Sequence, residues 1–482
     1  MSRLMLLLIL GFWLVGAEST RQPQLVYHPS LGIFFGGYVI LVLGVAIWAR
    51  LISRQVLGSN LQQSLRRFNR MSRLARWLVP AWLLFGLFGG AEWAQVVLAV
   101  TGTKLQFPST VLGTLPVLAA WMALWWAEFP ADRALREQSL LGELTLDLPL
   151  HLPAGFLRSF RNSFRQQLLP IVLPVLLIIL LRDLMMLLVG RYISPTQHEL
   201  LMLPAALGVY LASPQILRRV FNARRLDDSP LRQRLEAICR RNGLRYRDIL
   251  LWQTDYTVAN AAVIGILPLW RYVLLSDRLL ETMSDQQIEA VFAHELGHIV
   301  HHHLTWFVVF FVILLLASFG PGQILDNWIT AHLPPTFLAE QHRDIRDLIG
   351  SGIVFLAMIV LFSMLSRRFE RQADVFAARM MEFDWGSAET QAKPKVLGRR
   401  YHVGQRGAAI FNSALHRVAV VNNIPLRARD WFHPSVANRL QYLEDLSSDP
   451  ARTVDFDRVM SRLYAILLIA LLLCGAFVWL AK

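Results

Sequence analysis

The most informative stretch of this chain is Ser284–His298, which reads SDQQIEAVFAHELGH. A helix is expected here, because Ser284 or Asp285 can cap its amino terminus. The apolar residues that follow repeat with helical spacing and form one stripe, made up of Ile288, Val291 and Phe292. The stretch therefore predicts a capped helix that carries two histidines near its end.

His294, Glu295 and His298 form an H-E-x-x-H motif on this helix. Residues four apart lie on one helical face, about 6 Å apart along the axis, so both imidazoles can reach one Zn²⁺. Glu295 is placed to take a proton from a metal-bound water, which predicts peptide-bond hydrolysis. Taken alone, the motif also fits a surface helix with two chance histidines.

A second helix supplies a candidate third ligand. Catalytic zinc has three protein ligands and one open position. The extended H-E-x-x-H-x-x-G-x-x-H pattern fails, because His301 and Leu304 stand where Gly and His are needed. Glu370 and Asp374 lie four residues apart, so Glu370 can bind zinc while Asp374 accepts the other ring N–H of a ligating histidine. We therefore expect one Zn²⁺ per chain, held by the two motif histidines and Glu370; the alternative for the acidic pair is a solvated charge cluster.

The pairing of HELGH with SRRFERQAD at 366–374, across two hydrophobic spans, resembles the membrane-embedded zinc metalloproteases. These include the CAAX prenyl endopeptidases and the bacterial HtpX proteases. The resemblance covers about residues 225–445. It implies a gluzincin-type domain inside a cage of helices. The run His301–His303 is expected to extend the motif helix, and His303 matches a histidine of the prenyl-endopeptidase branch.

Two further segments carry the resemblance. Asn260 and Ala261 look like part of the family's substrate-edge strand, which implies that they bind the substrate backbone. His433-Pro434, followed by Arg439-Leu440, looks like a family segment in which a His-Pro pair precedes an Arg-Leu pair. It implies that His433 stabilises the charge that develops on the substrate carbonyl, and that Arg439 contributes to substrate binding. The alternative for His433 is a loop histidine beside a helix cap.

The composition is that of a polytopic membrane protein. Of 482 residues, 55% are hydrophobic and 17% are charged. Two cysteines, Cys239 and Cys474, provide neither a disulfide framework nor a Cys-ligated zinc. The expected spans are Leu31–Ile52, Trp77–Thr101, Ser109–Phe129, Leu168–Val189, Leu200–Val220, Leu304–Leu325, Ile349–Leu365 and Leu463–Leu480. Residues 1–17 fit either a cleaved signal peptide or a first span.

The net charge is +14, and the arginines that contribute to it cluster beside the expected spans. Arginine-rich segments such as Arg54–Arg76, which holds six arginines, fall on one side of the membrane if the spans alternate. The H-E-x-x-H helix falls on that side too, so the positive-inside rule puts the zinc site at the cytoplasmic face. A signal-like amino terminus with compact loops indicates a bacterial inner membrane. Topology accounts for the arginines, so no nucleic-acid partner is expected.

Ionisable residues also occur within the expected spans. Arg182 and Asp183 lie in one span and Glu92 lies in another. Such groups are costly at membrane depth and usually face a bundle interior or a wet cavity. They can form a structural ion pair or line a watery chamber that leads to the zinc, and both interpretations stay open.

The predicted fold is a predominantly α-helical polytopic membrane protein with a small, cytoplasmic-facing α+β zinc protease domain. The expected division places an amino-terminal bundle at 1–220, catalytic segments at 221–303 and 367–460, two spans at 304–366 and a last span at 461–482. Short strands are expected at Ile249–Trp252 and Arg271–Ser276, around a turn at Leu267-Pro268.

The predicted function is a membrane zinc endopeptidase that cuts membrane-associated or membrane-protein substrates. One alternative is processing of prenylated CAAX termini. Another is a non-catalytic scaffold that keeps the fold, against which the intact Glu295 argues. A third is recruitment of nucleic acid or anionic lipid by the arginine loops. The sequence leaves the oligomeric state open.

Overall fold

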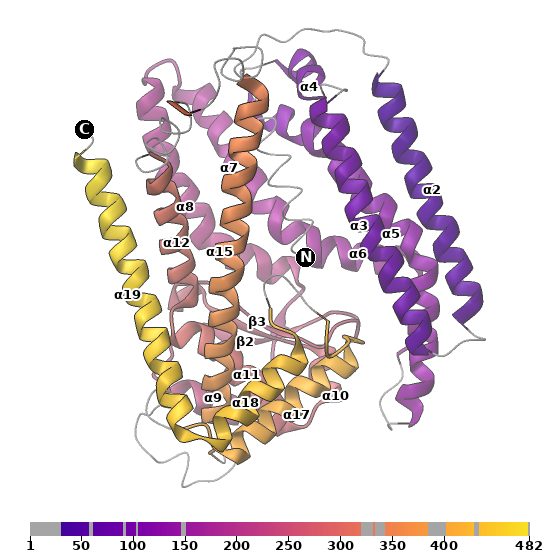
Figure 1. Ribbon diagram of the computed structural model, residues 1–482, viewed down its shortest axis with the longest axis vertical. Coiled ribbons are helices and arrows are strands. Elements are labelled where there is room, and N and C mark those ends of the chain that lie inside the picture. The colour runs from indigo at the N-terminus through magenta and orange to yellow at the C-terminus, as the bar shows by residue number, and fades with distance from the viewer. Residues whose placement is uncertain are drawn as a thin grey trace. The chain divides into compact units, whose positions relative to one another are not determined.

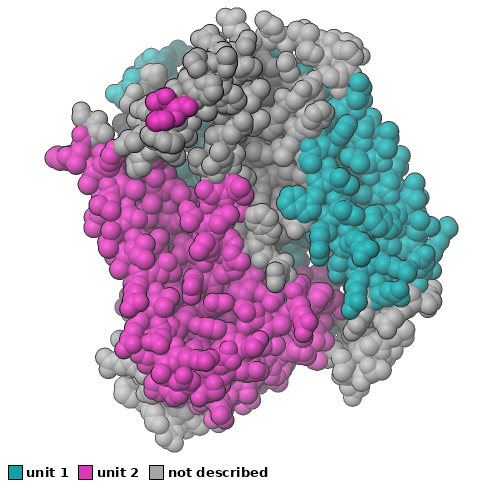
Figure 2. Space-filling model, viewed as in Figure 1, with its two compact units in different colours: residues 1–221 teal, residues 222–482 magenta. Residues whose placement is uncertain are grey.

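The computed structural model describes residues 30–56, 61–89, 93–102, 105–145, 151–319, 331–332, 343–383, 402–428 and 433–480. The chain forms two compact units, residues 1–221 and residues 222–482 (Figure 2). The helical fold class and the small α+β part expected from the sequence are both confirmed (Figure 1).

Unit 1 is helical in every element that the structure describes. Its helices are α2 (Ser30–Val56), α3 (Leu61–Gly89), α4 (Trp93–Thr101), α5 (Gln106–Thr145), α6 (Phe156–Ser163), the π-helix η1 (Phe164–Leu168), α7 (Leu169–Val189) and α8 (Pro195–Val220). Helices α2, α3 and α5 pack together around small apolar clusters that include Phe34 and Val79.

The single span expected over Trp77–Thr101 stays a prediction, because residues 90–92 lie outside the described residues. Helix α3 ends at Gly89 and α4 begins at Trp93. Glu92 lies outside the described residues.

The buried carboxylate of Asp183 caps α5. It accepts hydrogen bonds from the backbone N–H groups of Gln106, at 3.0 Å, and Phe107, at 2.7 Å. These donors have no partner within the helix, and the positive end of the helix dipole favours an anion there. Arg182 Nη1 lies 3.3 Å from Asp183 Oδ1. Of the two interpretations left open above, this geometry favours the structural one.

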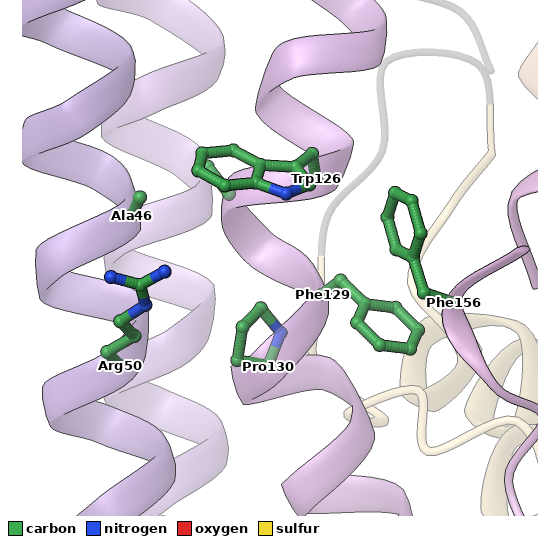
Figure 3. A pocket seen from close by; sticks show the side chains of 7 residues that line it. Ala46, Arg50, Trp126, Phe129, Pro130 and Phe156 are labelled. Carbon is green, nitrogen blue, oxygen red and sulfur yellow. The ribbon is translucent and has the colours of Figure 1, made fainter.

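A small cavity of about 230 Å³ lies between α2 and α5 in unit 1 (Figure 3). Arg50 reaches toward it from α2, while Trp126, Phe129 and Pro130 line it from α5. Apart from the guanidinium, its lining is apolar or aromatic.

Four described helical segments are long and apolar enough to cross a membrane: Leu31–Val56, Gln106–Gln138, Phe156–Val189 and Pro450–Leu480. The helix pair Asp285–Val300 and His303–Ala317, bent by 43°, is a fifth candidate. Large apolar side chains on the first and last of these segments are well exposed, such as Ile33 at 70% and Leu472 at 70%. Exposure on this scale suits contact with lipid.

Unit 2 contains a four-stranded sheet with strand order β1-β2-β4-β3. Strands β2 (Asp248–Trp252) and β4 (Tyr272–Ser276) pair in parallel, and β1 (Arg224–Arg225) and β3 (Ala261–Ile264) add antiparallel at the two edges. The two strands expected around a turn are therefore not a hairpin. The hairpin joins β3 to β4 through Gly265, at φ +94°, and the 3₁₀ turn η2 (Pro268–Trp270).

The described helices of unit 2 include α9 (Pro230–Arg241), α10 (Asp277–Thr282), α11 (Asp285–Val300), α12 (His303–Phe319), α15 (Arg343–Met380), α17 (Gln405–Val421), α18 (Val436–Ser448) and α19 (Pro450–Leu480). Helix α11 contacts β3 and α9 as well as α15 and α17. Its buried residues Phe292 and Leu296 join one core with Leu235, Leu275 and Phe376. The H-E-x-x-H helix is thus central to unit 2.

Candidate metal centre

The capped helix expected before the motif is confirmed. Ser284 caps α11 and forms a capping box with Gln287. The Ser284 hydroxyl accepts from the Gln287 backbone N–H, and Gln287 Oε1 accepts from the Ser284 backbone N–H. The helix ends at Val300. His302 adopts a left-handed φ of 54°, and α12 starts at His303. The expected extension of the helix through His301–His303 is therefore wrong.

A glycine brings the two ligand-bearing helices together. A Cβ built on Gly297 would lie 3.0 Å from Ala373 Cα and 3.3 Å from Ala373 Cβ. Ordinary carbon contacts are about 3.5–4.0 Å, so only glycine fits here without movement. Residue 297 is the last variable position of the motif, and Ala373 lies between Glu370 and Asp374 on α15. This close approach places the acidic side chains of α15 against the histidines of α11.

His294, His298 and Glu370 converge on one point. One donor atom from each lies within 4.8 Å of the others. The Nε2 atoms of the two histidines are 3.4 Å apart, and the Glu370 carboxylate oxygens lie 3.7 Å from His294 Nε2 and 3.6 Å from His298 Nε2. Ligands at about 2.0–2.1 Å from a tetrahedral zinc stand roughly 3.3 Å apart. Two imidazoles and a carboxylate at these separations therefore fit a zinc ion with one position left open.

Asp374 contacts His294 on the side away from the metal ligands. Its Oδ1 lies 3.0 Å from His294 Nδ1, while Arg439 Nε and Nη2 donate to its two oxygens at 2.8 and 2.5 Å. Burial raises the pKa of Asp374, but Arg439 and His294 outweigh it and hold that pKa well below its usual range. For His294, burial lowers the pKa, but the contact with Asp374 outweighs burial, so that the pKa of His294 is raised overall. A permanent carboxylate of this kind orients His294 for metal binding.

Arg439 was expected to contribute to substrate binding. The structure places its guanidinium, on a side chain that is 11% exposed, against Asp374, with Nη1 3.7 Å from Glu370 Oε2. The side chain thus contacts the outer partner of one ligand and the carboxylate of another. Its contact with substrate stays a prediction.

Glu295 is half-buried beside this group. Burial raises the pKa of its carboxyl group from the ordinary 4.5 to about 7, and the negative charge of Glu370 acts in the same direction. His294 opposes the shift. A carboxyl group with a pKa near neutrality can both accept and return a proton.

His433 lies at the rim of the centre. Its side chain is half exposed, and its Nε2 stands 3.7 Å from Glu370 Oε1. It precedes α18, which Ser435 caps through the backbone N–H of Asn438. His433 thus lies beside a helix cap and also beside a candidate metal ligand, so its position agrees with both interpretations.

Asn260 and Ala261 lie at the start of β3. The backbone N–H of Asn260 donates to the Ser276 hydroxyl, and the backbone carbonyl of Asn260 accepts from the Ser276 N–H. Strand β3 pairs only with β4 among the described strands, so its outer edge carries unpaired backbone groups. Ala261 is buried and the Asn260 side chain is exposed. An extended peptide can pair with such an edge.

Three contributors were missed or left without a role. Gly297 and Ala373 permit the close approach of the helices, and Gln372 accepts a hydrogen bond near His298. A glycine inside an otherwise good helix, opposite an alanine on the second motif, is the signal that could have identified the first two. Gln372 gives no such signal, because its partners come from helices distant in sequence.

Residues 226–447 match the family model described as Peptidase family M48. A protease HtpX homolog from Aeropyrum pernix is 25% identical over 203 residues, which cover 42% of this chain and 60% of that protein. A CAAX prenyl protease 1 homolog from Oryza sativa subsp. japonica is 26% identical over 243 residues, which cover 49% of this chain and 52% of that protein. The chain thus spans less than two thirds of the length of these curated relatives.

The solved structure of S. mikatae Ste24p aligns over 88% of this chain and 100% of its own, with a TM-score of 0.40 and 16% identity. The family match includes both histidines of the motif, Glu370 and Asp374. Residues 226–447 therefore match a peptidase family M48 domain, and the chain that carries this domain is a polytopic helical membrane protein.

Proposed function

We propose that this protein is a zinc-dependent endopeptidase that cuts membrane-associated or membrane-protein substrates at the cytoplasmic face of a membrane. The observation that carries the proposal is the triangle of His294, His298 and Glu370, whose donor atoms stand 3.4–3.7 Å apart. One Zn²⁺ per chain fits this triangle. A scaffold without activity would need neither the open position nor the adjacent Glu295.

Zinc, when bound there, would act as a Lewis acid that lowers the pKa of water and polarises the substrate carbonyl. Glu295 accepts the proton of the attacking water and returns it to the leaving amine. His433 donates a hydrogen bond to the negative charge that develops on the carbonyl oxygen. Asn260 and Ala261 hold the substrate as a strand added to β3.

Processing of prenylated CAAX termini is the second candidate function. It is favoured by the relatives named CAAX prenyl protease 1 homolog, whereas the relatives named protease HtpX homolog favour the broader peptidase role. Both candidates use the same centre and differ only in the substrate that reaches it.

The proposed location is a bacterial inner membrane with the centre facing the cytoplasm. The arginine-rich segments beside the spans support it, because positive charge stays on the cytoplasmic side. We also propose the division into an amino-terminal bundle at 1–220, catalytic segments at 221–303 and 367–460, and spans at 304–366 and 461–482. Partners are then a peptide or membrane-protein substrate and the bilayer itself, with no role for nucleic acid.

Replacement of the proposed base tests the function. Purified Glu295→Gln protein should keep about one zinc per chain and lose peptidase activity by about 10²–10⁴-fold, because an amide cannot accept the proton. The parent chain should cleave a membrane-protein substrate, with zinc measured by metal analysis in both preparations. Near-normal turnover in Glu295→Gln, or a parent chain without zinc, would refute the proposal.

A further inference from the structure

A row of hydrogen bonds leads from the ligand His298 to the last helix of the chain. His298 Nδ1 lies 2.9 Å from His303 Nδ1, and His303 Nε2 lies 2.9 Å from Gln372 Oε1. The hydroxyl of Tyr464, on α19, donates to the same Gln372 oxygen. The row thus joins α11, α12, α15 and α19.

Metal binding fixes every proton in this row. A neutral imidazole that binds metal through Nε2 carries its hydrogen on Nδ1, so His298 Nδ1–H must donate to His303 Nδ1. His303 then carries its own hydrogen on Nε2 and donates it to Gln372 Oε1. That carbonyl oxygen has two lone pairs and accepts from both His303 and Tyr464. With the Gln372 oxygen facing both partners, every donor meets an acceptor in this arrangement, which is the one that zinc at His298 Nε2 requires.

Aromatic packing holds the row in place. The ring of His303, which is 1% exposed, stacks on Phe369 with ring centroids 4.3 Å apart and an interplanar angle of 2°. The ring of Tyr464 stacks on Trp306 of α12 at 4.6 Å. Neither His303 nor Tyr464 can turn away without losing this packing, so the positions of their polar atoms are set by the helices that carry them.

The two ligand histidines therefore have different outer partners. His294 faces the carboxylate of Asp374, whereas His298 faces the neutral imidazole of His303. A neutral acceptor orients the ring of His298 without adding negative charge to the centre. It also makes the orientation of His298 depend on a helix far along the chain.

We propose that α19 helps to hold the zinc ligand His298 in place through Tyr464, Gln372 and His303. These three are positioning residues for the metal, and the inference rests on the zinc site of the proposed function. Outer partners of metal ligands typically change metal affinity by 10–100-fold when they are replaced. A helix that anchors the chain in the membrane thereby also tunes its metal centre.

The test measures zinc and cobalt binding by the full chain in detergent, in a Glu295→Gln background that prevents self-cleavage. His303→Phe keeps the stacking on Phe369 but removes the acceptor for His298. It should weaken zinc binding by about 10–100-fold in competition with a chromogenic chelator. The absorption bands of bound Co²⁺, which report ligand geometry, should change as well.

Tyr464→Phe removes one hydroxyl and keeps the ring, so its effect should be smaller, about 2–10-fold in zinc affinity. Two matched controls should leave zinc affinity and the Co²⁺ spectrum unchanged: Tyr442→Phe on α18 and His416→Phe at an exposed position of α17. Should His303→Phe not fold, Tyr464→Phe against Tyr442→Phe decides the question alone.

Zinc affinity within twofold of the parent and an unaltered Co²⁺ spectrum in both variants would overturn this inference and leave the proposed function intact. A parent chain that binds no zinc would overturn both. Weaker zinc binding in His303→Phe and Tyr464→Phe, with unchanged controls, is the expected result.

Discussion

Gly297→Ala should separate metal binding from stability. The new Cβ would lie 3.0 Å from Ala373 Cα and 3.3 Å from the Cβ atoms of Ala373 and Phe376. Carbon contacts relax to about 3.5–4.0 Å, so α15 must retreat from α11 by roughly 0.5–1 Å. Glu370 belongs to α15, and its carboxylate oxygens lie 3.6–3.7 Å from the Nε2 atoms of the two histidines. The same retreat would carry Glu370 beyond bonding reach of a zinc held by His294 and His298.

The expected cost in folding free energy is small. Alanine in place of glycine gains about 1 kcal/mol of helix propensity, while overpacking costs about 1–3 kcal/mol. The net loss is therefore no more than about 2 kcal/mol. Zinc affinity should fall by at least about 10-fold and peptidase activity by about 10²-fold, because a displacement of 1 Å at a reacting centre has effects of that size.

Zinc binding, peptidase rate and thermal unfolding of the purified chain would be measured together. Gly475→Ala is the matched control, since a Cβ at this helical position of α19 meets nothing within 4 Å. Adding Ala373→Gly to Gly297→Ala should rescue zinc binding only in part, because the 3.0 Å contact is with the Ala373 backbone. Unchanged zinc affinity and activity in Gly297→Ala would refute the idea that this close approach sets the ligand geometry.

Three further outcomes are expected. Arg439→Lys should lower zinc affinity about 10-fold, measured with a competing chelator, because a lysine cannot make the paired hydrogen bonds to Asp374; unchanged affinity would contradict that role. His433→Ala should lower kcat by about 10²–10³-fold with zinc content unchanged. Asn260→Ala should instead raise KM more than it lowers kcat. Small and equal effects of the two variants on kcat would show that neither residue belongs to the site. In chelator-treated protein, Glu295→Gln should raise the unfolding temperature at pH 8 and not at pH 4. Burial raises the pKa of Glu295 from 4.5 to about 7, so the wild type carries a destabilising buried charge above that pH and none at pH 4. Equal shifts in unfolding temperature at both pH values would contradict this.

Local sequence patterns predicted the elements that carry the ligands. Helix α11 follows from its cap and apolar spacing, and Glu370 and Asp374 share a face because they lie four residues apart. These features depend on neighbouring residues only. The same holds for the spans expected over Leu31–Ile52, Ser109–Phe129, Leu168–Val189 and Leu463–Leu480, whose length and hydrophobicity are local features.

Features that depend on pairing between distant segments were not predictable in this way. Short apolar runs on either side of a turn located β2 and β4 but could not show that they pair in parallel, with β3 joined to β4 instead. The sequence places Asp183 inside an expected span, but it cannot show that backbone N–H groups at the amino terminus of α5 donate hydrogen bonds to this carboxylate. The break at His302 also escaped notice, since a histidine with positive φ has no clear sequence signature.

The charges around the centre explain why the metal and the fold are coupled. With Glu295, Glu370 and Asp374 ionised and Arg439 protonated, the buried group carries two net negative charges. A divalent cation neutralises them, and in its absence proton uptake is the available compensation, which is the direction of the raised pKa of Glu295. Asp374 cannot take up that proton, because Arg439 and His294 hold its pKa low. The arginine therefore keeps the carboxylate behind His294 charged when zinc arrives.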